Sequence, residues 1–152
     1  MFGEHFIKIV LIGDSFDDAY NAAVEDCNKR KKTFIHPFND EKVIEGQATL
    51  GLELINQAAS PIDYIFVAVG GGGLASGMSA VFKELSPNTK IIGVEPEGAP
   101  SMKLAFQKGE VVALDSINNF VDGAAVKRVG DKNFQICKEN LHDMITVPEG
   151  SA

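Results

Sequence analysis

The chain has 152 residues, 45% of them hydrophobic and 23% charged, and its formal net charge is −7. This length and composition suit an ordinary globular fold with a buried core. Arginine occurs only at Arg30 and Arg128, and the one basic run, residues 29–32, is short. Nucleic-acid binding needs clustered cations, so we expect no nucleic-acid partner. The basic run is better explained as a solvated helix end.

The cysteine content indicates a reducing compartment. Cys27 and Cys137 are far apart and have no metal-ligand spacing, which disfavours a disulfide framework and a zinc site. Residues 64–82 carry no charge, but four consecutive glycines within them make a membrane-spanning helix a poor interpretation. We therefore predict a soluble, cytoplasmic protein with no membrane partner.

The first third of the chain predicts two strands and two helices. Residues 6–12 are apolar and β-branched, which predicts a strand. Ser15 and Asp18 form a capping-box-like start to a helix that runs to residues 29–32. Residues 33–35 predict a short strand that ends before Pro37. A second helix begins near Asp40 and ends before residues 60–61. For the two glycines inside it, at positions 46 and 51, we expect close packing or ligand approach as the reason.

The rest of the chain alternates strands and helices. Strands are predicted at residues 64–69, 90–95 and 143–147, and helices at residues 74–85, 101–108 and 131–139. Residues 110–123 are less regular and predict a loop. This alternation is typical of an α/β fold with a mostly parallel sheet. The predicted sheet has open edges at both ends of the chain, so we expect it to be an incomplete piece of something larger.

Four glycines, residues 70–73, separate a buried strand from a helix; we call them the glycine loop. Residues without Cβ allow close backbone approach, and the N–H groups of a helix start favour an anion such as phosphate. A simple tight turn is the alternative, but four glycines exceed what a turn needs. A dinucleotide site, with Glu95 holding a ribose, fits loosely. A nucleoside-triphosphatase loop does not fit, because no Gly-Lys-Ser/Thr follows.

Six stretches of the chain, in order, resemble the fold-type II pyridoxal-phosphate enzymes, most closely the threonine dehydratase branch. They are GDSFD (residues 13–17), TFIHPFND (33–40), VIEGQAT (43–49), GGGGL (70–74), GVEPE (93–97) and DGAAVKR (122–128). The resemblance implies a three-layer, twisted parallel sheet like that of the tryptophan synthase β subunit. It also implies an amino-acid substrate and a homo-oligomeric parent enzyme.

The resemblance assigns a cofactor and an activity. The cofactor phosphate of pyridoxal 5′-phosphate would be bound by the backbone of Gly70, Gly71, Gly72, Gly73 and Leu74. Gly123 would lie near the cofactor ring, with a plain turn glycine as the alternative. The activity implied is β-elimination of L-threonine to 2-oxobutanoate and ammonia, as in isoleucine biosynthesis. A serine racemase or serine dehydratase is the alternative within the family.

Departures from the family pattern limit these expectations. The Schiff-base lysine motif has no counterpart in the chain, and Lys127 is not a substitute for it. We therefore expect residues 1–32 to be the tail of a small domain and residues 33–152 part of a large domain. The chain alone is expected to be inactive. A non-catalytic phosphate-binding module and a dinucleotide-binding domain remain competing hypotheses.

A cation site is a further implication of the resemblance. Glu95 and the carbonyl group of Ala99 resemble the cation site of serine racemases, where oxygen atoms surround a hard ion. Ser101 stands where those enzymes have an aspartate. The alternative is a carboxylate that caps the end of a strand and binds no metal.

Overall fold

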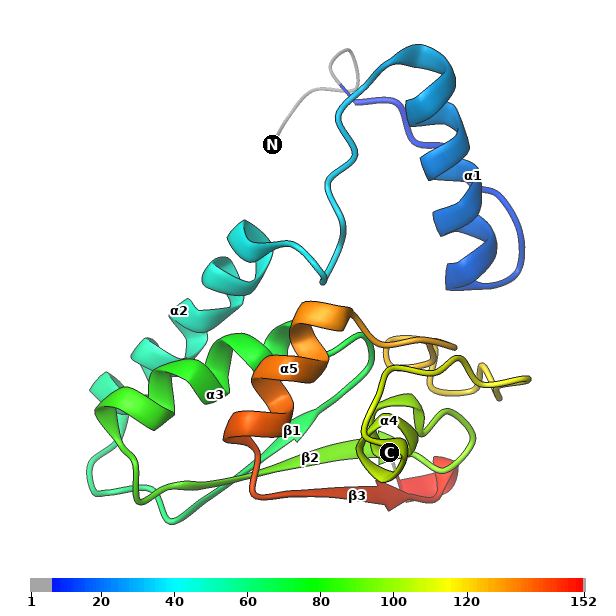
Figure 1. Cartoon of the computed structure of the whole chain (residues 1–152). Coiled ribbons are helices and arrows are strands. Elements are labelled where there is room, and N and C mark those ends of the chain that lie inside the picture. The colour runs from blue at the N-terminus through cyan, green and yellow to red at the C-terminus, as the bar shows by residue number, and fades with distance from the viewer. Residues whose placement is uncertain (1–6, 152) are drawn as a thin grey trace. The chain divides into compact units, whose positions relative to one another are not determined.

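The computed structural model describes residues 7–151, which belong to two compact units divided after Phe34 (Figure 1). In the N-terminal unit, helix α1 spans Phe16–Arg30. The hydroxyl group of Ser15 accepts a hydrogen bond from the N–H of Asp18 (3.2 Å) and donates one to its carboxylate (2.7 Å). Lys31 ends the helix in the left-handed conformation, with φ at 54°. The predicted start and the solvated basic end of this helix are both confirmed.

Two strands predicted in the first third of the chain are wrong. Residues 7–12 and 33–35 have no strand structure, and Phe6 lies outside the described residues. Ile9 and Leu11 are 79% and 91% exposed. A strand is stable only when a neighbouring strand takes up its backbone hydrogen bonds. Within residues 7–151 neither segment has such a neighbour, so the apolar pattern is present without the structure that it favours.

The second unit contains a three-stranded parallel sheet in the order β1-β2-β3 (Figure 1). Val67 of β1 lies opposite Gly93 of β2, which in turn lies opposite Met144 of β3. The strands of this sheet and the helices between them follow the predicted order: β1 Tyr64–Ala68, α3 Gly73–Leu85, β2 Lys90–Pro96, α4 Ser101–Lys108, α5 Asp131–Asn140 and β3 Asp143–Val147. A 3-10 turn, η1 Glu149–Ser151, follows β3 and was not predicted. The α/β class is confirmed, and residues 110–123 form the predicted loop.

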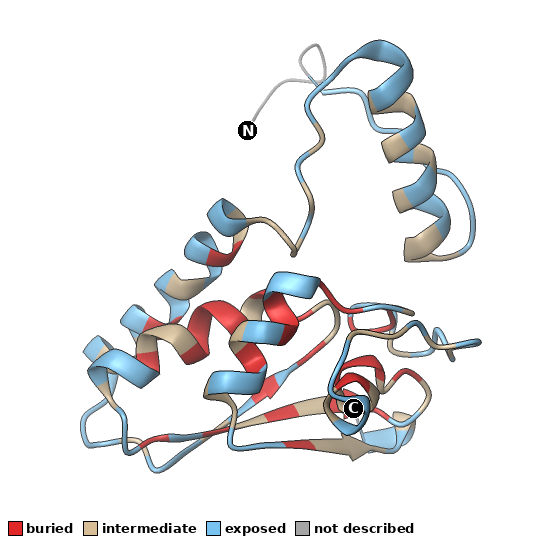
Figure 2. Cartoon of the chain, viewed as in Figure 1, coloured by how far each residue is buried: buried red, intermediate tan, exposed pale blue. Residues whose placement is uncertain are grey.

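The core lies between the sheet and helices α3 and α5 (Figure 2). Val69, Phe82, Ile91 and Phe134 are almost completely buried there. Val67 is buried on this face of the sheet. Side chains alternate along a strand, so Phe66 points to the opposite face, where it is 64% exposed. Among the described residues, the helical layer therefore covers one face of the sheet.

Helix α2, Glu41–Gln57, packs tightly against α3. Asp40 caps it by accepting hydrogen bonds from the N–H groups of Lys42 (2.8 Å) and Val43 (3.3 Å). A Cβ on Gly51 would lie 3.2 Å from the Cβ of Val81, so the predicted packing reason is confirmed there. A Cβ on Gly46 would meet nothing within 4 Å, and the packing reason is wrong for that glycine.

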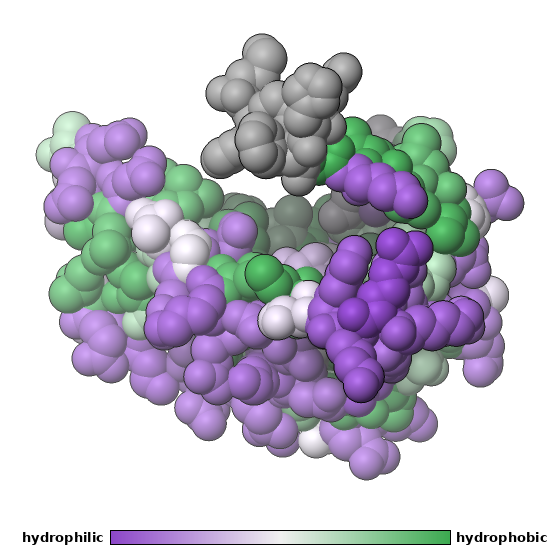
Figure 3. Space-filling view, turned by 90° about the horizontal axis from the view of Figure 1, so that it is seen from above, coloured by the Kyte–Doolittle hydropathy of each residue, from purple (hydrophilic) through white to green (hydrophobic). Residues whose placement is uncertain are grey.

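Hydrophilic residues predominate on the molecular face shown in Figure 3, with hydrophobic areas between them. In the described part of the chain, no helix has both the length and the apolar character that crossing a membrane requires.

Candidate functional site

The glycine loop lies at the carboxyl end of β1 and leads directly into α3. Gly72 is the N-cap of α3, with φ at 93°, and its carbonyl group accepts the first helical hydrogen bond from the N–H of Ser76 (2.9 Å). Within residues 7–151, none of the backbone N–H groups of residues 70–74 donates to a protein acceptor. Five successive donors are therefore available at the positive end of a helix dipole.

Close packing around the loop explains why glycine stands at each position. A Cβ on Gly71 would collide with the ring of Phe38, and one on Gly70 would lie 3.1 Å from the Cα of Ala124. At Gly72, the left-handed backbone and the methyl group of Met102, 2.8 Å from an added Cβ, both exclude a side chain. The loop is therefore held against several elements, and a larger residue would displace it.

The loop borders a cavity of about 300 Å³. Its lining brings together all the residues predicted for the cofactor: Gly70, Gly71, Gly72, Gly73, Leu74 and Gly123. The cavity lies beside the carboxyl end of a parallel strand, the usual position of ligand sites in α/β sheets. An added Cβ on Gly123 would meet nothing within 4 Å, so packing does not require a glycine there.

Sequence reasoning gave no role in the site to five further lining residues: Pro37, Phe38, Gln47, Ala68 and Ala124. All except Ala68 lie in stretches that resemble the enzyme family, which is the signal that could have identified them. The turn carrying Phe38 is fixed by His36, whose Nδ1 accepts hydrogen bonds from the N–H groups of Phe38 (3.3 Å) and Asn39 (3.0 Å). Burial lowers the pKa of His36, against the opposing charge of Asp40, and so favours the neutral form that can accept these bonds. His36 is therefore a structural residue, as expected.

Glu95 is completely buried at the end of β2, and both of its carboxylate oxygens have backbone partners. Oε1 accepts from the N–H of Met102 (2.7 Å) and Oε2 from the N–H of Lys103 (2.8 Å), in the first turn of α4. Burial raises the pKa of Glu95 to about 7, against the opposing effect of these bonds. The carbonyl group of Ala99 accepts from the N–H of Ser101 (3.0 Å). This geometry is that of a helix cap, the alternative to the predicted cation site.

No cluster of three acidic, histidine or cysteine side chains suited to a metal ion occurs in residues 7–151. Lys127 does not line the cavity beside the glycine loop; its carbonyl group accepts from the N–H of Leu114 (2.9 Å). That Lys127 does not form a Schiff base stays a prediction.

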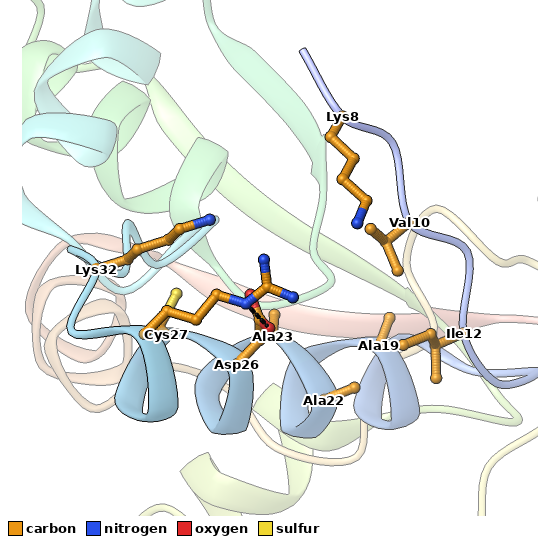
Figure 4. Close-up of a pocket in the computed structure, with 10 residues that line it drawn as sticks. Lys8, Val10, Ile12, Ala19, Ala22, Ala23, Asp26, Cys27 and Lys32 are labelled. Atoms are coloured by element: carbon orange, nitrogen blue, oxygen red, sulfur yellow. Dashed lines mark ion pairs between the residues drawn. The ribbon is translucent and has the colours of Figure 1, made fainter.

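A second cavity, of about 540 Å³, lies in the N-terminal unit between residues 8–12 and α1 (Figure 4). Val10 and Ile12 from the extended segment lie near Ala19, Ala22 and Ala23 of the helix. Arg30 at its rim is already paired with Asp26 (2.7 Å). Its lining mixes aliphatic and charged side chains and, among the described residues, includes none of the residues that start α1. The cavity beside the glycine loop, at the start of α3, is therefore the better candidate for an anion site.

Comparison with known proteins agrees with this geometry. The family model described as "Pyridoxal-phosphate dependent enzyme" matches residues 1–152, the whole chain. The chain belongs to this family of pyridoxal-phosphate dependent enzymes, which confirms the family predicted from the six sequence stretches.

Particular relatives are threonine dehydratases. The chain is 50% identical over 149 residues to "L-threonine dehydratase biosynthetic IlvA" of Halalkalibacterium halodurans, a match that covers 98% of this chain and 36% of the relative. The protein of the same name from Bacillus subtilis is 47% identical over 150 residues, with 99% and 36% covered. The chain thus spans about a third of the length of these curated relatives.

Solved structures show the same fold. Processed threonine deaminase isoform 2 from Solanum lycopersicum superimposes with a TM-score of 0.85 at 45% identity, over 91% of this chain and 40% of that one. Serine racemase from Dictyostelium discoideum superimposes with a TM-score of 0.73 at 36% identity, over 88% and 41%. The predicted fold type II is confirmed, and the likeness extends to the serine racemase branch.

Proposed function

We propose that the glycine loop binds the phosphate group of pyridoxal 5′-phosphate, and that the chain is the phosphate-binding part of a threonine dehydratase. The observation that carries this proposal is the row of five backbone N–H groups, residues 70–74, without a protein acceptor at the edge of a cavity. Phosphate oxygens are acceptors only, and they are favoured at the start of a helix.

The residues present fit a phosphate group. The glycines leave room for its oxygens to approach the backbone, and no carboxylate of residues 7–151 lines the cavity and would repel it. In this proposal residues 70–74 hold and orient the phosphate, while Phe38 and Ala124, which also line the cavity, pack against the loop. When bound, pyridoxal phosphate supplies an electron sink for the Cα of an amino acid, so that the α-proton and the β-hydroxyl group can leave. Gly123 would face the ring.

The proposed substrate is L-threonine, with 2-oxobutanoate and ammonia as products, because the curated relatives are named threonine dehydratases. L-Serine is the second candidate, supported by the likeness to a serine racemase. The parent enzyme is proposed to be a cytoplasmic homo-oligomer. The division after Phe34 supports the assignment of residues 1–32 to a small domain and 33–152 to a large one.

Among the described residues, no lysine lines the cavity beside the glycine loop. We therefore expect this chain to bind the cofactor without forming a specific covalent bond to it, and to be inactive alone. Titration of the 152-residue chain with pyridoxal 5′-phosphate and with pyridoxal, followed by visible absorbance, tests the binding. Saturable binding that requires the phosphate group supports the proposal, and equal binding of the two compounds contradicts it. Borohydride reduction and intact mass measurement then show whether one lysine has reacted stoichiometrically.

A cation at Glu95 and Ala99 remains a proposal supported only by the sequence resemblance. Both Glu95 oxygens already accept backbone hydrogen bonds, so an ion would share them with the first turn of α4. Thermal unfolding in K⁺, Mg²⁺ and Ca²⁺, compared between the chain and its Glu95→Gln variant, tests this site. A cation-specific rise in melting temperature that disappears in the variant would support it.

A further inference from the structure

Asn133 connects α5 to two walls of the proposed phosphate site. Its side chain is completely buried in the first turn of α5. Nδ2 donates one hydrogen bond to the carbonyl oxygen of Gly71 (2.8 Å) and another to that of Phe38 (2.9 Å). One amide group thus joins the glycine loop to the segment whose ring lies against it.

The carbonyl oxygen of Gly71 is held from two directions. Besides Asn133, it accepts a hydrogen bond from the N–H of Gly130 (3.1 Å), just before α5. No cis peptide bond occurs among the described residues. In a trans peptide the carbonyl group and the following N–H point in opposite directions. With the Gly71 carbonyl fixed toward α5, the N–H of Gly72 must point away from α5. Asn133 does not line the cavity that Gly72 borders.

The oxygen atom of the Asn133 side chain indicates that the hydrogen bonds donated by Nδ2 are the reason for an asparagine at this position. Oδ1 is buried and has no hydrogen-bond partner within residues 7–151. Leaving a buried acceptor unsatisfied is unfavourable, and an apolar residue at this position would avoid that cost. The two bonds from Nδ2 are therefore what the side chain contributes. A second link supports the same connection, since the N–H of Lys132 donates to Oδ1 of Asn39, beside Phe38 (3.0 Å).

We propose that Asn133 is a positioning residue for phosphate binding: by fixing the carbonyl groups of Gly71 and Phe38, it aims the Gly72 N–H at the ligand. This inference rests on the proposed function of the glycine loop. According to this inference, a residue of α5, a helix outside the glycine loop, determines the direction in which the Gly72 N–H points. Asn133 itself does not touch the ligand.

The first test compares Asn133→Ala with Ser79→Ala in the 152-residue chain. Ser79 is a matched control because it is also buried, and its hydroxyl group bonds only within α3, to the carbonyl of Ser76 (3.2 Å). We expect Asn133→Ala to weaken binding of pyridoxal 5′-phosphate at least tenfold, while the weaker binding of pyridoxal, which has no phosphate, is unchanged. Ser79→Ala should leave both affinities within twofold. An unchanged phosphate-ester affinity, or an equal loss for both ligands, would overturn the positioning role.

A second test needs no variant and remains decisive if Asn133→Ala does not fold. In a ¹⁵N NMR titration of the unmodified chain with pyridoxal 5′-phosphate, the Gly72 N–H and the side-chain amide of Asn133 should shift together. Side-chain amides elsewhere, such as that of exposed Asn118, should not shift. If the glycine-loop signals shift while the Asn133 amide does not, the positioning role fails and the proposed function stands. If no glycine-loop signal responds, the proposed function fails, and the inference built on it fails too.

Discussion

Gly77 of α3 faces the carbonyl oxygen of Ile44 in α2 so closely that an added Cβ would lie 2.6 Å from it. The same Cβ would lie 2.6 Å from the backbone nitrogen of Ala48. The two helices therefore touch backbone to backbone at this point. Because α3 begins at the glycine loop, this contact also fixes the helix that presents the proposed phosphate site.

Gly77→Ala should destabilise the chain. The added methyl group meets backbone atoms, which cannot turn aside as a side chain can, so α2 and α3 must separate. Overpacking of this kind costs about 1–3 kcal/mol, which exceeds the gain of about 1 kcal/mol from replacing a helical glycine except at the lowest end of that range. Urea unfolding followed by circular dichroism measures the change in unfolding free energy.

Gly46→Ala is the matched control for that measurement. Gly46 also lies inside a helix, but an added Cβ meets nothing within 4 Å. This substitution should therefore raise the unfolding free energy by up to about 1 kcal/mol through helix propensity alone. If both alanine variants change stability in the same direction, the backbone contact at Gly77 is not decisive.

Gly72→Ala should weaken binding of pyridoxal 5′-phosphate by an order of magnitude or more. Gly72 has φ at 93°, and its added Cβ would lie 2.8 Å from Met102 Cε and 2.9 Å from Asn133 Cβ. Relieving the backbone strain or the contacts with these side chains would move the loop and its N–H donors. Gly109→Ala is the control, because Gly109 also has a positive φ, 77°, but open space around it. Gly109→Ala should lower stability by about 1 kcal/mol and leave cofactor affinity unchanged. Equal affinities of the two variants would contradict the assigned site.

Sequence alone predicted those parts of the structure that depend on local pattern. The glycine loop, the strand before it and the helix after it are contiguous in the chain, so one short stretch of sequence predicts all three. The strand predictions for residues 7–12 and 33–35 failed because an apolar, β-branched pattern shows that a segment suits a sheet, but not that another strand lies beside it. Contacts between residues far apart in the sequence could not be predicted either. Gly46 and Gly51 look alike in sequence, and only the position of Val81 distinguishes them.

The site shows the same division. The residues proposed to bind phosphate could be predicted together because they form one run in the chain. Asn133 was missed because it is one polar residue in a helical segment, and its two partners, Gly71 and Phe38, are 62 and 95 residues away. No periodicity or spacing encodes such a link. The role of Glu95 was open between metal ligand and cap, and only the distances to the first turn of α4 favour the cap.

The two thiol groups should differ sharply in reactivity. Cys137 is completely buried, its Sγ lies 3.4 Å from the hydroxyl group of Ser76, and burial raises its pKa to about 11. Cys27, in α1, is only half-buried. The thiolate is the reactive form, so at pH 8 the folded chain should react with one equivalent of a disulfide reagent quickly and a second only on unfolding. Cys27→Ser should abolish the fast phase. A fast phase that survives in this variant would show that α5 opens readily.

Glu95 should make the stability of the chain depend on pH. Burial raises its pKa in the folded state from 4.5 to about 7. Between these values the folded state keeps a proton that the unfolded state has lost, so the unfolding free energy falls as pH rises. The decline attributable to Glu95 is about 3 kcal/mol between pH 4.5 and pH 7.5. Urea unfolding at a series of pH values measures it.

Glu95→Gln is the critical comparison, because glutamine is similar in shape and does not titrate, although its NH2 group cannot accept one of the two backbone hydrogen bonds that Glu95 accepts. The lost hydrogen bond lowers the unfolding free energy by the same amount at every pH, whereas the decline between pH 4.5 and pH 7.5 should be absent from the variant. Glu97→Gln, at an exposed position two residues away, should keep the pH dependence of the unmodified chain. Parallel pH curves for the chain and Glu95→Gln would mean that the hydrogen bonds from Met102 and Lys103 outweigh desolvation. Glu95 would then cap α4 as a carboxylate throughout this range.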